Sequence, residues 1–410
     1  MRVFMALGPG DIVGDHEKRV AGRAAFRSMR GETSITFSAQ AIALLHARGH
    51  EALLVSSHPR RARFSEGAIE TRNVPKWRVG RGGIAFHIGQ VAYAIRLAAM
   101  ARRFRAHLAI IDSGTTHWFM LTAFTLMGIP VALNFHNVRW PQGFEPRGTL
   151  ARFIRRLDSW FIRTRAKGAA GCSPECAIQA RADGADALPV FLWTGQFSAD
   201  GFEPEQPPAQ DGAFHVLFAG RVERNKGVFD LVEMASMLRT RPDLKVVFDV
   251  CGDGGDLEPL RAAVKQADLA DVVRVHGRLE RAALLQAYAR AHVVIVPTRG
   301  DFCEGMPLVC AEAMLSGRPV ITSRLSNALP VIGEAIAEAQ PESPPSYVAA
   351  IEMLARDPSA WARLQAATIP CRQQFLDRSR SYPVALDRLI ALVAKDSQPP
   401  LAYRHLFDED

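Results

Sequence analysis

The sequence predicts two α/β domains, each built on a parallel sheet with helices on both faces. Its 410 residues exceed one ordinary core, because a domain usually takes roughly 100–200 residues. Short apolar runs alternate with amphipathic segments in both halves, which is typical of doubly wound sheets. A proline-rich, acidic stretch at residues 198–213 separates the halves and predicts a linker. The composition, 48% hydrophobic and 22% charged, excludes a disordered, collagen-like or multi-spanning membrane chain.

The first half contains four apolar runs that predict parallel strands, at residues 3–7, 52–56, 108–112 and 130–135. Helical patterns lie between them, and the two clearest are residues 38–47 and 89–104. Gly49 follows the first of these helices at the position where glycine commonly ends a helix. Such sheets bind ligands at the carboxyl ends of their strands, so the loops after these runs are candidate site segments.

The 26 residues between Asp112 and Arg139 carry no Asp, Glu, Lys or Arg, and about 20 residues suffice to span a bilayer. Gly128 and Pro130 divide this stretch into a helix-length and a strand-length piece. A buried helix followed by a buried strand is therefore favoured over a membrane span.

The second half repeats the pattern. Strands are predicted at residues 215–219, 245–250, 272–276, 292–297 and 319–322, and helices at 228–238, 257–267 and 281–289. A final helical stretch covers residues 361–392. We therefore assign residues 1–197 to an N-terminal domain and residues 198–213 to the linker. Residues 214–370 are assigned to a C-terminal domain and residues 371–395 to a C-terminal helix that crosses back to the first domain. Residues 396–410 are assigned to a loose tail.

The net charge of +8 is unevenly distributed. Residues 1–197 hold 27 Lys and Arg against 13 Asp and Glu, whereas residues 198–410 hold 23 against 29. The basic half indicates an anionic partner, either a phospholipid surface or a phosphorylated substrate, with an arginine-rich background composition as the alternative. No nucleic-acid-binding motif is present. Within residues 150–165, apolar residues recur at helical spacing among arginines, so this helix either packs on the sheet, which is favoured, or lies on an anionic membrane.

The first motif with chemical content, Gly220-Arg221-Val222-Glu223-Arg224-Asn225-Lys226-Gly227, follows the strand at 215–219. Gly220 permits a tight turn, and the side chains of Arg221 and Lys226 reach the crevice at the strand end. Two cations there suit a diphosphate, because they stabilise a departing phosphate without a metal. The chain has only seven lysines, which makes a surface-loop explanation for Lys226 less attractive.

The second motif is Cys251-Gly252-Asp253-Gly254-Gly255, directly after the strand at 245–250. Gly252 and Gly254 would let a ligand approach the backbone closely, although an ordinary turn explains them equally well.

The third motif runs from Glu304 to Glu312 and is followed by Gly317-Arg318-Pro319-Val320. Pro307 suits the first turn of a helix, whose free N–H groups make an anion site. Glu304 precedes this helix and Glu312 lies one to two turns inside it. Since carboxylates repel phosphate, they are predicted to accept hydrogen bonds from hydroxyls, one on a sugar and one on a ribose. The alternative is that Glu304 only interacts favourably with the dipole at the helix N-terminus and that Glu312 is an ordinary surface residue.

These three motifs in this order resemble the retaining glycosyltransferases of family 4, which have the GT-B fold. The resemblance covers nearly all of residues 214–322. It implies that the C-terminal domain holds a nucleotide-diphosphate sugar, a UDP- or GDP-sugar, with no further cofactor. In that reading Arg221 and Lys226 contact the diphosphate, Glu312 the ribose and Glu304 the sugar. The backbone and side chains beside them complete the donor site, namely Gly220, Gly252, Gly254, Gly305, Met306, Pro307, Leu308 and Val309.

The N-terminal half matches the family more loosely. Gly10 and Asp11 follow the first strand, beside Gly8 and Gly14, and would line the acceptor side unless they form only a flexible polar loop. His136 ends the strand at 130–135, where the family often has a histidine near the transferred sugar; a capping role is the alternative. The family's usual glycine pair is missing near Gly31. The glycine pair and glutamate that usually follow the strand at 319–322 are also absent.

The function expected from the resemblance is transfer of a sugar, with retention of configuration, from a nucleotide-diphosphate sugar to a hydroxyl acceptor. No metal ligands are predicted, and His136, Arg221, Lys226 and Glu304 are the expected catalytic residues. The expected setting is bacterial surface polysaccharide or lipid-linked glycan synthesis, in the cytoplasm or peripherally on the inner membrane face. The alternatives are a nucleotide-sugar epimerase or hydrolase on the same fold, or a non-catalytic nucleotide-sugar-binding protein.

Overall fold

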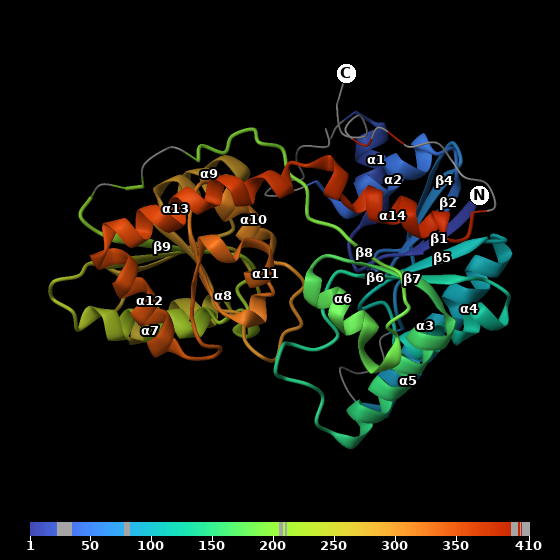
Figure 1. The fold of residues 1–410 in the computed structure, drawn as a ribbon, viewed down its shortest axis with the longest axis horizontal. Helices are drawn as coiled ribbons and strands as arrows, with labels where there is room; N and C mark the ends of the chain where they lie inside the picture. Colours follow the sequence, from blue (N-terminus) through green and yellow to red (C-terminus); the bar gives the residue numbers. More distant parts are fainter. Residues whose placement is uncertain are drawn as a thin grey trace.

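The computed structural model describes residues 1–22, 35–77, 83–204, 208–209, 211–394, 401 and 403. Figure 1 shows two α/β bodies side by side, each with a central sheet covered by helices. The predicted two-domain α/β architecture is confirmed. Parts of the expected linker and nearly all of the expected tail, as well as residues 31–34, lie outside the described residues.

The N-terminal sheet has the strand order β3-β4-β2-β1-β5-β6-β7-β8. Its strands are β1 (Arg2–Ala6), β2 (Glu51–Ser56), β3 (Ala62–Glu66), β4 (Ile69–Asn73), β5 (Leu108–Asp112), β6 (Val131–Phe135), β7 (Ala166–Gly171) and β8 (Val190–Leu192). The expectation of an entirely parallel sheet was wrong for β3, which pairs antiparallel with β4. Only Gly67 and Ala68 connect these strands, and a two-residue connection can join only antiparallel neighbours.

The helices of this domain are α1 (Ile12–Val20), α2 (Phe37–Ala47), α3 (Gly83–Arg103), η1 (Trp118–Leu121), α4 (Thr122–Leu126), α5 (Thr149–Arg165), α6 (Pro174–Arg181) and η2 (Ala182–Gly184). The uncharged stretch between Asp112 and Arg139 forms η1, α4 and the buried strand β6. In the described parts of the chain, no helix is both long enough and apolar enough to cross a bilayer.

The C-terminal sheet is parallel throughout, with the order β11-β10-β9-β12-β13-β14. Its strands are β9 (Phe214–Ala219), β10 (Val246–Cys251), β11 (Val273–Gly277), β12 (Val293–Val296), β13 (Val320–Thr322) and β14 (Ile336–Glu338). Around it lie η3 (Arg224–Lys226), α7 (Val228–Arg239), α8 (Leu257–Gln266), α9 (Arg281–Arg290), α10 (Leu308–Leu315), η4 (Arg324–Ser326), α11 (Leu329–Ile332), η5 (Gly333–Ala335), α12 (Pro344–Arg356) and α13 (Pro358–Arg372).

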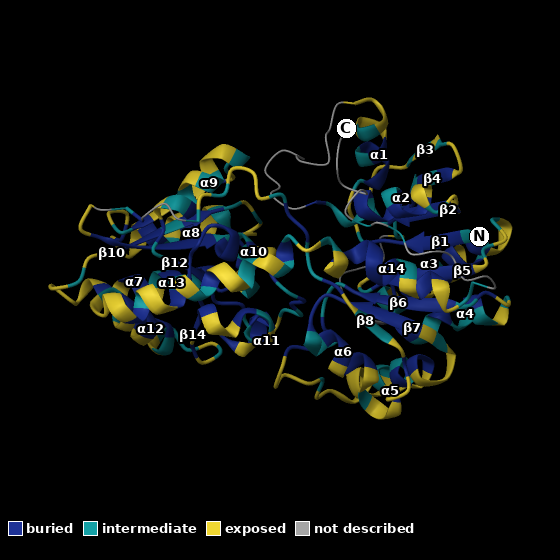
Figure 2. Cartoon of the chain, turned by 45° about the horizontal axis from the view of Figure 1, so that its top comes forward, coloured by how far each residue is buried: buried dark blue, intermediate teal, exposed yellow. Residues whose placement is uncertain are grey.

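The central strands of both sheets are buried, whereas the edge strands β3 and β11 and the outer sides of the helices carry exposed residues (Figure 2). Strands such as β5 and β6 are buried at every position because helices cover both faces of the sheet. Burial of these apolar strands supplies the main favourable term for each domain.

The C-terminal helical stretch is not one helix, which corrects the sequence-based expectation. Pro370 lies near the end of α13, and two short turns, η6 (Gln373–Phe375) and η7 (Arg378–Arg380), follow before α14 (Tyr382–Ala391). The carboxylate of Asp377 caps η7 by accepting from the backbone N–H of Ser379 at 3.0 Å. In Figure 1 the chain returns across the molecule here, and α14 packs on α2 and β7 of the N-terminal domain.

The two connections between the domains run side by side. The backbone N–H of Thr194 donates to the carbonyl of Arg380 at 2.8 Å, and that of Phe197 donates to the carbonyl of Phe375 at 3.1 Å. The guanidinium of Arg378 donates to the carbonyl of Phe197 at 2.9 Å. The outgoing and returning segments thus form one hydrogen-bonded crossing.

A largely buried ion pair attaches α14 to the N-terminal domain. Arg48, at the C-terminal end of α2, donates to Asp387 through Nε at 2.9 Å, and the two side chains are 8% and 13% exposed.

Asp387→Asn leaves the guanidinium without its counter-charge, which typically costs about 3 kcal/mol at a buried site. We expect the first thermal unfolding transition to fall by about 6 °C, measured by scanning calorimetry. A matched change at the exposed Asp268 should leave the transition where it is; equal effects would contradict the assigned role of α14.

Candidate functional site

A cavity of about 660 Å³ lies between the two domains, at the carboxyl ends of β9, β10 and β12. Most of its lining comes from the C-terminal domain, and Ile35, Thr36 and Phe37 at the start of α2 close it from the other side. The carboxyl ends of parallel strands at a point where the strand order reverses are the expected binding position in this architecture.

The structure brings most of the predicted site residues together around this cavity. Those that line it are Gly220, Arg221, Lys226, Gly252, Glu304, Met306, Pro307, Leu308, Val309 and Glu312. The predicted residues outside the lining are Gly10, Asp11, His136, Gly254 and Gly305. The sequence signal therefore located the C-terminal side of the cavity better than its N-terminal side.

Lys226 and Glu304 form an ion pair inside the cavity. The ammonium of Lys226 donates to Oε2 of Glu304, and the two side chains are 17% and 11% exposed. The same ammonium lies 4.0 Å from the centre of the Phe302 ring, a favourable cation–π contact. The pair therefore places one positive and one negative group side by side in a partly water-excluded position.

Arg221 stands at the edge of the cavity rather than inside it. Its guanidinium donates to both carboxylate oxygens of Glu223 at 2.7 Å, and its side chain is 54% exposed. It also lies 5.3 Å from the centre of the Phe302 ring. The exposed pair with Glu223 contributes little to stability, so a stronger anionic partner can draw Arg221 away.

Glu312 is held from behind by a buried tyrosine. Tyr288 on α9 is fully buried and its hydroxyl donates to Oε2 of Glu312. Burial raises the pKa of Tyr288 well above its usual range, so the hydroxyl keeps its proton and remains a donor. Arg318, also fully buried, donates through Nε to the carbonyl of Tyr288 at 3.1 Å. The end of α9 is thereby attached to the loop before β13.

Helix α10 begins at Leu308, so Pro307 is the N-cap residue and not a member of the first turn, which corrects the sequence-based placement. Its φ of −63° and ψ of 126° are extended, and no side chain caps this helix. The backbone N–H groups of Leu308 and Val309 lie in the uncapped first turn beside the cavity. Together they form a partial positive end suited to an anion.

Three glycines bring backbone segments close together near the site. A Cβ on Gly252 would lie 1.7 Å from the carbonyl oxygen of Gly220, and the φ of Gly252 is +151°. A Cβ on Gly305 would lie 2.0 Å from the carbonyl oxygen of His136 and 2.5 Å from Sγ of Cys172. Gly305 thus marks a direct contact between the domains. A Cβ on Gly254 would lie 2.3 Å from the carbonyl oxygen of Val222, so a side chain has no room there either.

His136 does not line the cavity but lies behind Phe37, which does. Its Nε2 is 3.0 Å from Oδ2 of Asp112, and its ring centre is 4.9 Å from that of Phe37, which lines the cavity. Trp193 and Tyr382 contact the same ring. With Nε2 directed to Asp112, the imidazole is oriented by a carboxylate.

The segment from His136 to Trp140 connects the N-terminal domain to the loop that carries Glu304. The backbone N–H of Val138 donates to the carbonyl of Glu304 at 3.2 Å. Asn327, in the loop where the family glycines are missing, donates from Nδ2 to the same carbonyl at 2.8 Å. Both domains therefore position the backbone at Glu304.

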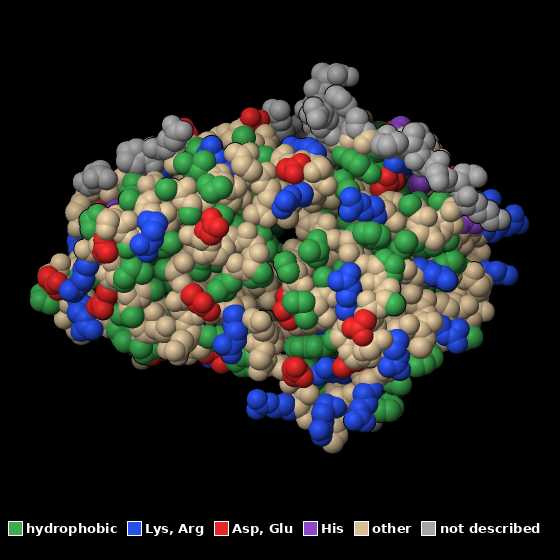
Figure 3. All heavy atoms as spheres, in the orientation of Figure 1, with side chains coloured by type: hydrophobic (Ala, Val, Ile, Leu, Met, Phe, Trp, Pro, Cys, Tyr) green, Lys and Arg blue, Asp and Glu red, His purple; other side chains and the backbone are tan. Residues whose placement is uncertain are grey.

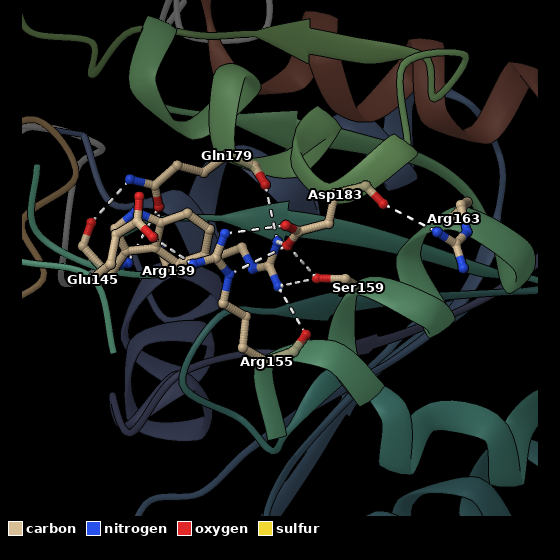
Figure 4. Close-up of polar contacts among 8 residues, drawn as sticks. Arg139, Glu145, Arg155, Ser159, Arg163, Gln179 and Asp183 are labelled. Carbon is tan, nitrogen blue, oxygen red and sulfur yellow. Dashed lines mark hydrogen bonds and ion pairs between the residues drawn. The ribbon is translucent and has the colours of Figure 1, made fainter. Parts of the chain in front are cut away.

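Figure 4 shows how this segment is held from the N-terminal side. The buried side chain of Gln179 on α6 accepts from the backbone N–H groups of Arg139 at 2.7 Å and Trp140 at 3.2 Å, and donates to the Trp140 carbonyl at 2.9 Å. Arg139, with a side chain 5% exposed, donates to Ser159 of α5 at 2.8 Å and lies 3.8 Å from Asp183. Three helical elements thus fix one short segment.

Gly10 and Asp11 lie outside the cavity lining, and Asp11 is engaged in contacts of its own domain. Asp11 caps α1 by accepting from the backbone N–H of Gly14 at 3.1 Å. Its carboxylate also accepts from Asn73 at 2.6 Å and pairs with Arg60 at 2.8 Å, and these partners lower its pKa. The carboxylate is therefore engaged within its own domain.

Several cavity residues were not predicted from the sequence. Asp253 and Arg278 follow β10 and β11, so the strand-end rule that selected Gly220 could have found them. Thr36 and Phe37, which line the cavity, and Tyr288, which lies behind Glu312, gave no such signal, because they reach the site only through packing. Among the residues that the structure describes, no three His, Cys, Asp or Glu side chains gather as a metal-binding group.

Two family models match the chain. Residues 34–192 match the model described as "Glycosyl transferase 4-like domain", and residues 200–369 match the model described as "Glycosyl transferases group 1". The two matches fall on the two domains in order.

Relatives and solved structures agree with these matches. The D-inositol 3-phosphate glycosyltransferase of Arthrobacter sp. is 35% identical over 117 residues, 28% of this chain and 27% of that protein. The chain spans about a quarter to a half of the curated relatives it matches. Sucrose-phosphate synthase of Thermosynechococcus elongatus superposes with a TM-score of 0.67 at 17% identity, covering 99% of both chains. HepE of Anabaena, solved with UDP and glucose, gives 0.60 at 16% identity, over 95% of this chain and 98% of that one. These structures have the same fold.

The role of Gln179 can be tested by removing its hydrogen bonds at nearly constant volume. Gln179→Met leaves two backbone N–H groups and one carbonyl unpaired in a buried position, which we expect to cost about 3 kcal/mol. Thermal denaturation should show a lower transition for the N-terminal domain. A Gln179→Met protein as stable as the parent would contradict the assigned role.

Proposed function

The chain belongs to the group 1 glycosyltransferases, which have the GT-B fold, and from this premise we propose that it transfers a sugar from a nucleotide-diphosphate sugar to a hydroxyl acceptor. We further propose retention of anomeric configuration and catalysis without a metal ion. The observation that carries this proposal is the Lys226–Glu304 ion pair in the interdomain cavity, next to the first turn of α10. One cation, one helix end and one carboxylate are the groups that a diphosphate and a sugar hydroxyl require.

The ion pair also supports a sequence of events on donor binding. The diphosphate competes with Glu304 for the ammonium of Lys226, and Arg221 leaves its exposed contact with Glu223. Once released, Glu304 accepts hydrogen bonds from hydroxyls of the transferred sugar. The two cations and the N–H groups at Leu308 and Val309 then stabilise the charge that develops on the leaving diphosphate. The acceptor hydroxyl attacks the anomeric carbon from the face that the diphosphate leaves. The bond between that carbon and the diphosphate oxygen breaks, and the hydroxyl proton passes to the departing diphosphate.

The donor side of the proposal assigns Glu312 to the ribose. Its carboxylate lines the cavity, and Tyr288 fixes its orientation from the buried side. HepE, which has the same fold, was solved with UDP and glucose, and this supports a UDP-sugar before a GDP-sugar. His136, ordered by Asp112 behind Phe37, is proposed to act on the sugar side once the domains close on the donor.

The proposed setting is the synthesis of bacterial surface polysaccharide or lipid-linked glycan, with a glycan or lipid-linked acceptor. The N-terminal half, which carries 27 Lys and Arg against 13 Asp and Glu, faces the anionic inner surface of the membrane in this proposal. The protein would then act in the cytoplasm, in peripheral contact with the bilayer.

The experiment that tests the function is a thermal-shift screen against UDP, GDP and ADP and their common hexose conjugates, with EDTA present. A bound nucleotide stabilises the native state by RT ln(1 + [L]/Kd), which reveals the donor class. Acceptor-dependent consumption of the conjugate supports the transferase. If free or epimerised sugar is the main product in the absence of acceptor, the protein is a hydrolase or an epimerase. If the nucleotide sugar binds without turnover, the protein is a non-catalytic binding protein.

Lys226 and Glu304 should affect nucleotide binding in opposite directions. Lys226→Ala removes a charge-assisted contact to phosphate and should raise the Kd for the nucleoside diphosphate about tenfold to 100-fold. Glu304→Gln removes the competing carboxylate, so the nucleotide should bind slightly more tightly while turnover falls about 100-fold. Calorimetric titration and turnover assays measure both quantities. If the two variants weakened nucleotide binding equally, the proposed exchange of partners would be wrong.

Tyr288→Phe should weaken recognition of the ribose hydroxyls only. Loss of one hydrogen bond to a carboxylate is expected to raise the Kd for UDP about tenfold. Binding of 2′,3′-dideoxy-UDP should not change, because it presents no hydroxyl to Glu312. The parent protein is measured with both nucleotides as the control. A similar loss for both nucleotides would assign Tyr288 to general stability of the domain.

A further inference from the structure

One layer of the N-terminal domain leaves apolar side chains exposed at regular spacing. Helices α3, α4 and α5 and the turn η1 pack against one another to form this layer. Their large exposed apolar residues are Ile88, Val91 and Ile95 on α3, Leu126 on α4, and Leu150, Phe153 and Trp160 on α5. The residues on α3 are three and four positions apart, and those on α5 are three and seven positions apart, which is one and two helical turns. Each set therefore forms a stripe along one side of its helix.

The exposures are large for side chains of this kind. Ile95 is 52% exposed, Leu126 is 77% exposed, and Leu150 and Phe153 are each 57% exposed. Single exposed apolar residues are normal on a protein surface, but stripes on neighbouring helices of one layer mark an interaction surface.

The charges of the same layer are almost entirely positive. Helices α3, α4 and α5 together contain eight arginines, namely Arg96, Arg102, Arg103, Arg152, Arg155, Arg156, Arg163 and Arg165. Their single acid is Asp158, which turns inward, accepts from the backbone N–H of Phe119 at 3.0 Å and has a pKa raised to about 6 by burial. Figure 3 shows Lys and Arg side chains gathered at the lower edge of the molecule, where Figure 1 places α5.

From these observations we infer that the α3–α4–α5 layer is a docking surface for an anionic phospholipid bilayer. Apolar stripes flanked by arginines, on helices without an exposed carboxylate, match the chemistry of a helix that lies in the headgroup region. Arg155 is already paired with Glu145 and Asp183. For the other arginines, a soluble acidic protein would need carboxylates placed against particular side chains, whereas a bilayer of anionic lipid presents negative charge along the whole layer. This layer is the surface that would make the membrane contact proposed above. The inference rests on the proposed function only for the direction from which the acceptor arrives.

The layer is also connected to the interdomain site. Asp158 on α5 accepts from Phe119 in η1, and Arg139 donates to Ser159 and to the carbonyl of Arg155 on α5. Arg139 belongs to the segment that contacts the backbone of Glu304. A bilayer docked on α5 would therefore lie against the helix that holds the segment in contact with Glu304.

The test is co-sedimentation of the full-length protein with vesicles of phosphatidylcholine alone and of phosphatidylcholine mixed with phosphatidylglycerol. We expect binding to the mixed vesicles, weak binding to phosphatidylcholine alone, and a fall in binding as salt is added. The double variant Ile95→Glu, Phe153→Glu should lower the partition coefficient at least about tenfold, because each glutamate replaces an inserted apolar group with a repelled charge. Arg152→Glu with Arg156→Glu should have a similar effect.

Matched controls lie on the C-terminal domain. Met353→Glu and Ile369→Glu change residues that are 43% and 48% exposed, and Arg363→Glu reverses an exposed charge; none should alter vesicle binding. The inference is overturned if the parent protein ignores the mixed vesicles, if it binds both vesicle types equally, or if layer and control variants behave alike. It is also overturned if the layer variants instead break a dimer seen by light scattering. Nucleotide-induced thermal shifts, measured on the same samples, report separately on the proposed function.

Discussion

The contact of Gly305 with the carbonyl of His136 is the constraint on which the arrangement of the site depends. There is no room for a side chain at Gly305, so the loop before α10 lies directly against the strand end of the other domain. The hydrogen bond from Val138 to the carbonyl of Glu304 fixes the neighbouring residue in the same contact. A carboxylate in the second domain is therefore positioned by the first domain, and the cavity exists only when both are in place.

The charged groups around the cavity are arranged as matched pairs. Lys226 holds Glu304 and Tyr288 holds Glu312, so neither acid stands unpartnered in a partly buried position. Such groups would be costly to bury alone, because an isolated charge loses its hydration. The two partners differ in what a ligand can do to them. A phosphate can replace Glu304 at Lys226, whereas the buried hydroxyl of Tyr288 stays with Glu312 and leaves that acid oriented.

The N-terminal domain supports the site from a distance. Gln179, Arg139 and Asp183 connect α5, α6 and η2 to the segment that ends at His136. Of these elements, α5 also belongs to the α3–α4–α5 layer with exposed apolar stripes and arginines. One domain thus joins a surface with the chemistry of a membrane contact to the backbone that positions Glu304.

The sequence by itself determined the fold class, the order of most strands and helices, and the loops that line the C-terminal side of the cavity. These features depend on local periodicity and on the rule that ligands meet the carboxyl ends of parallel strands. Only the tertiary structure decided that β3 runs antiparallel, that the final helix is broken before α14, that Asp11 caps α1, and that Lys226 pairs with Glu304. It also placed Thr36, Phe37 and Tyr288 at the site. The physical reason differs between them. The Lys226–Glu304 pair and the placement of Phe37 and Tyr288 join residues far apart in the chain, so side-chain packing, which no local pattern records, selects them. The β3–β4 turn, the cap of α1 and the break before α14 are local contacts that the periodicity of apolar residues does not record.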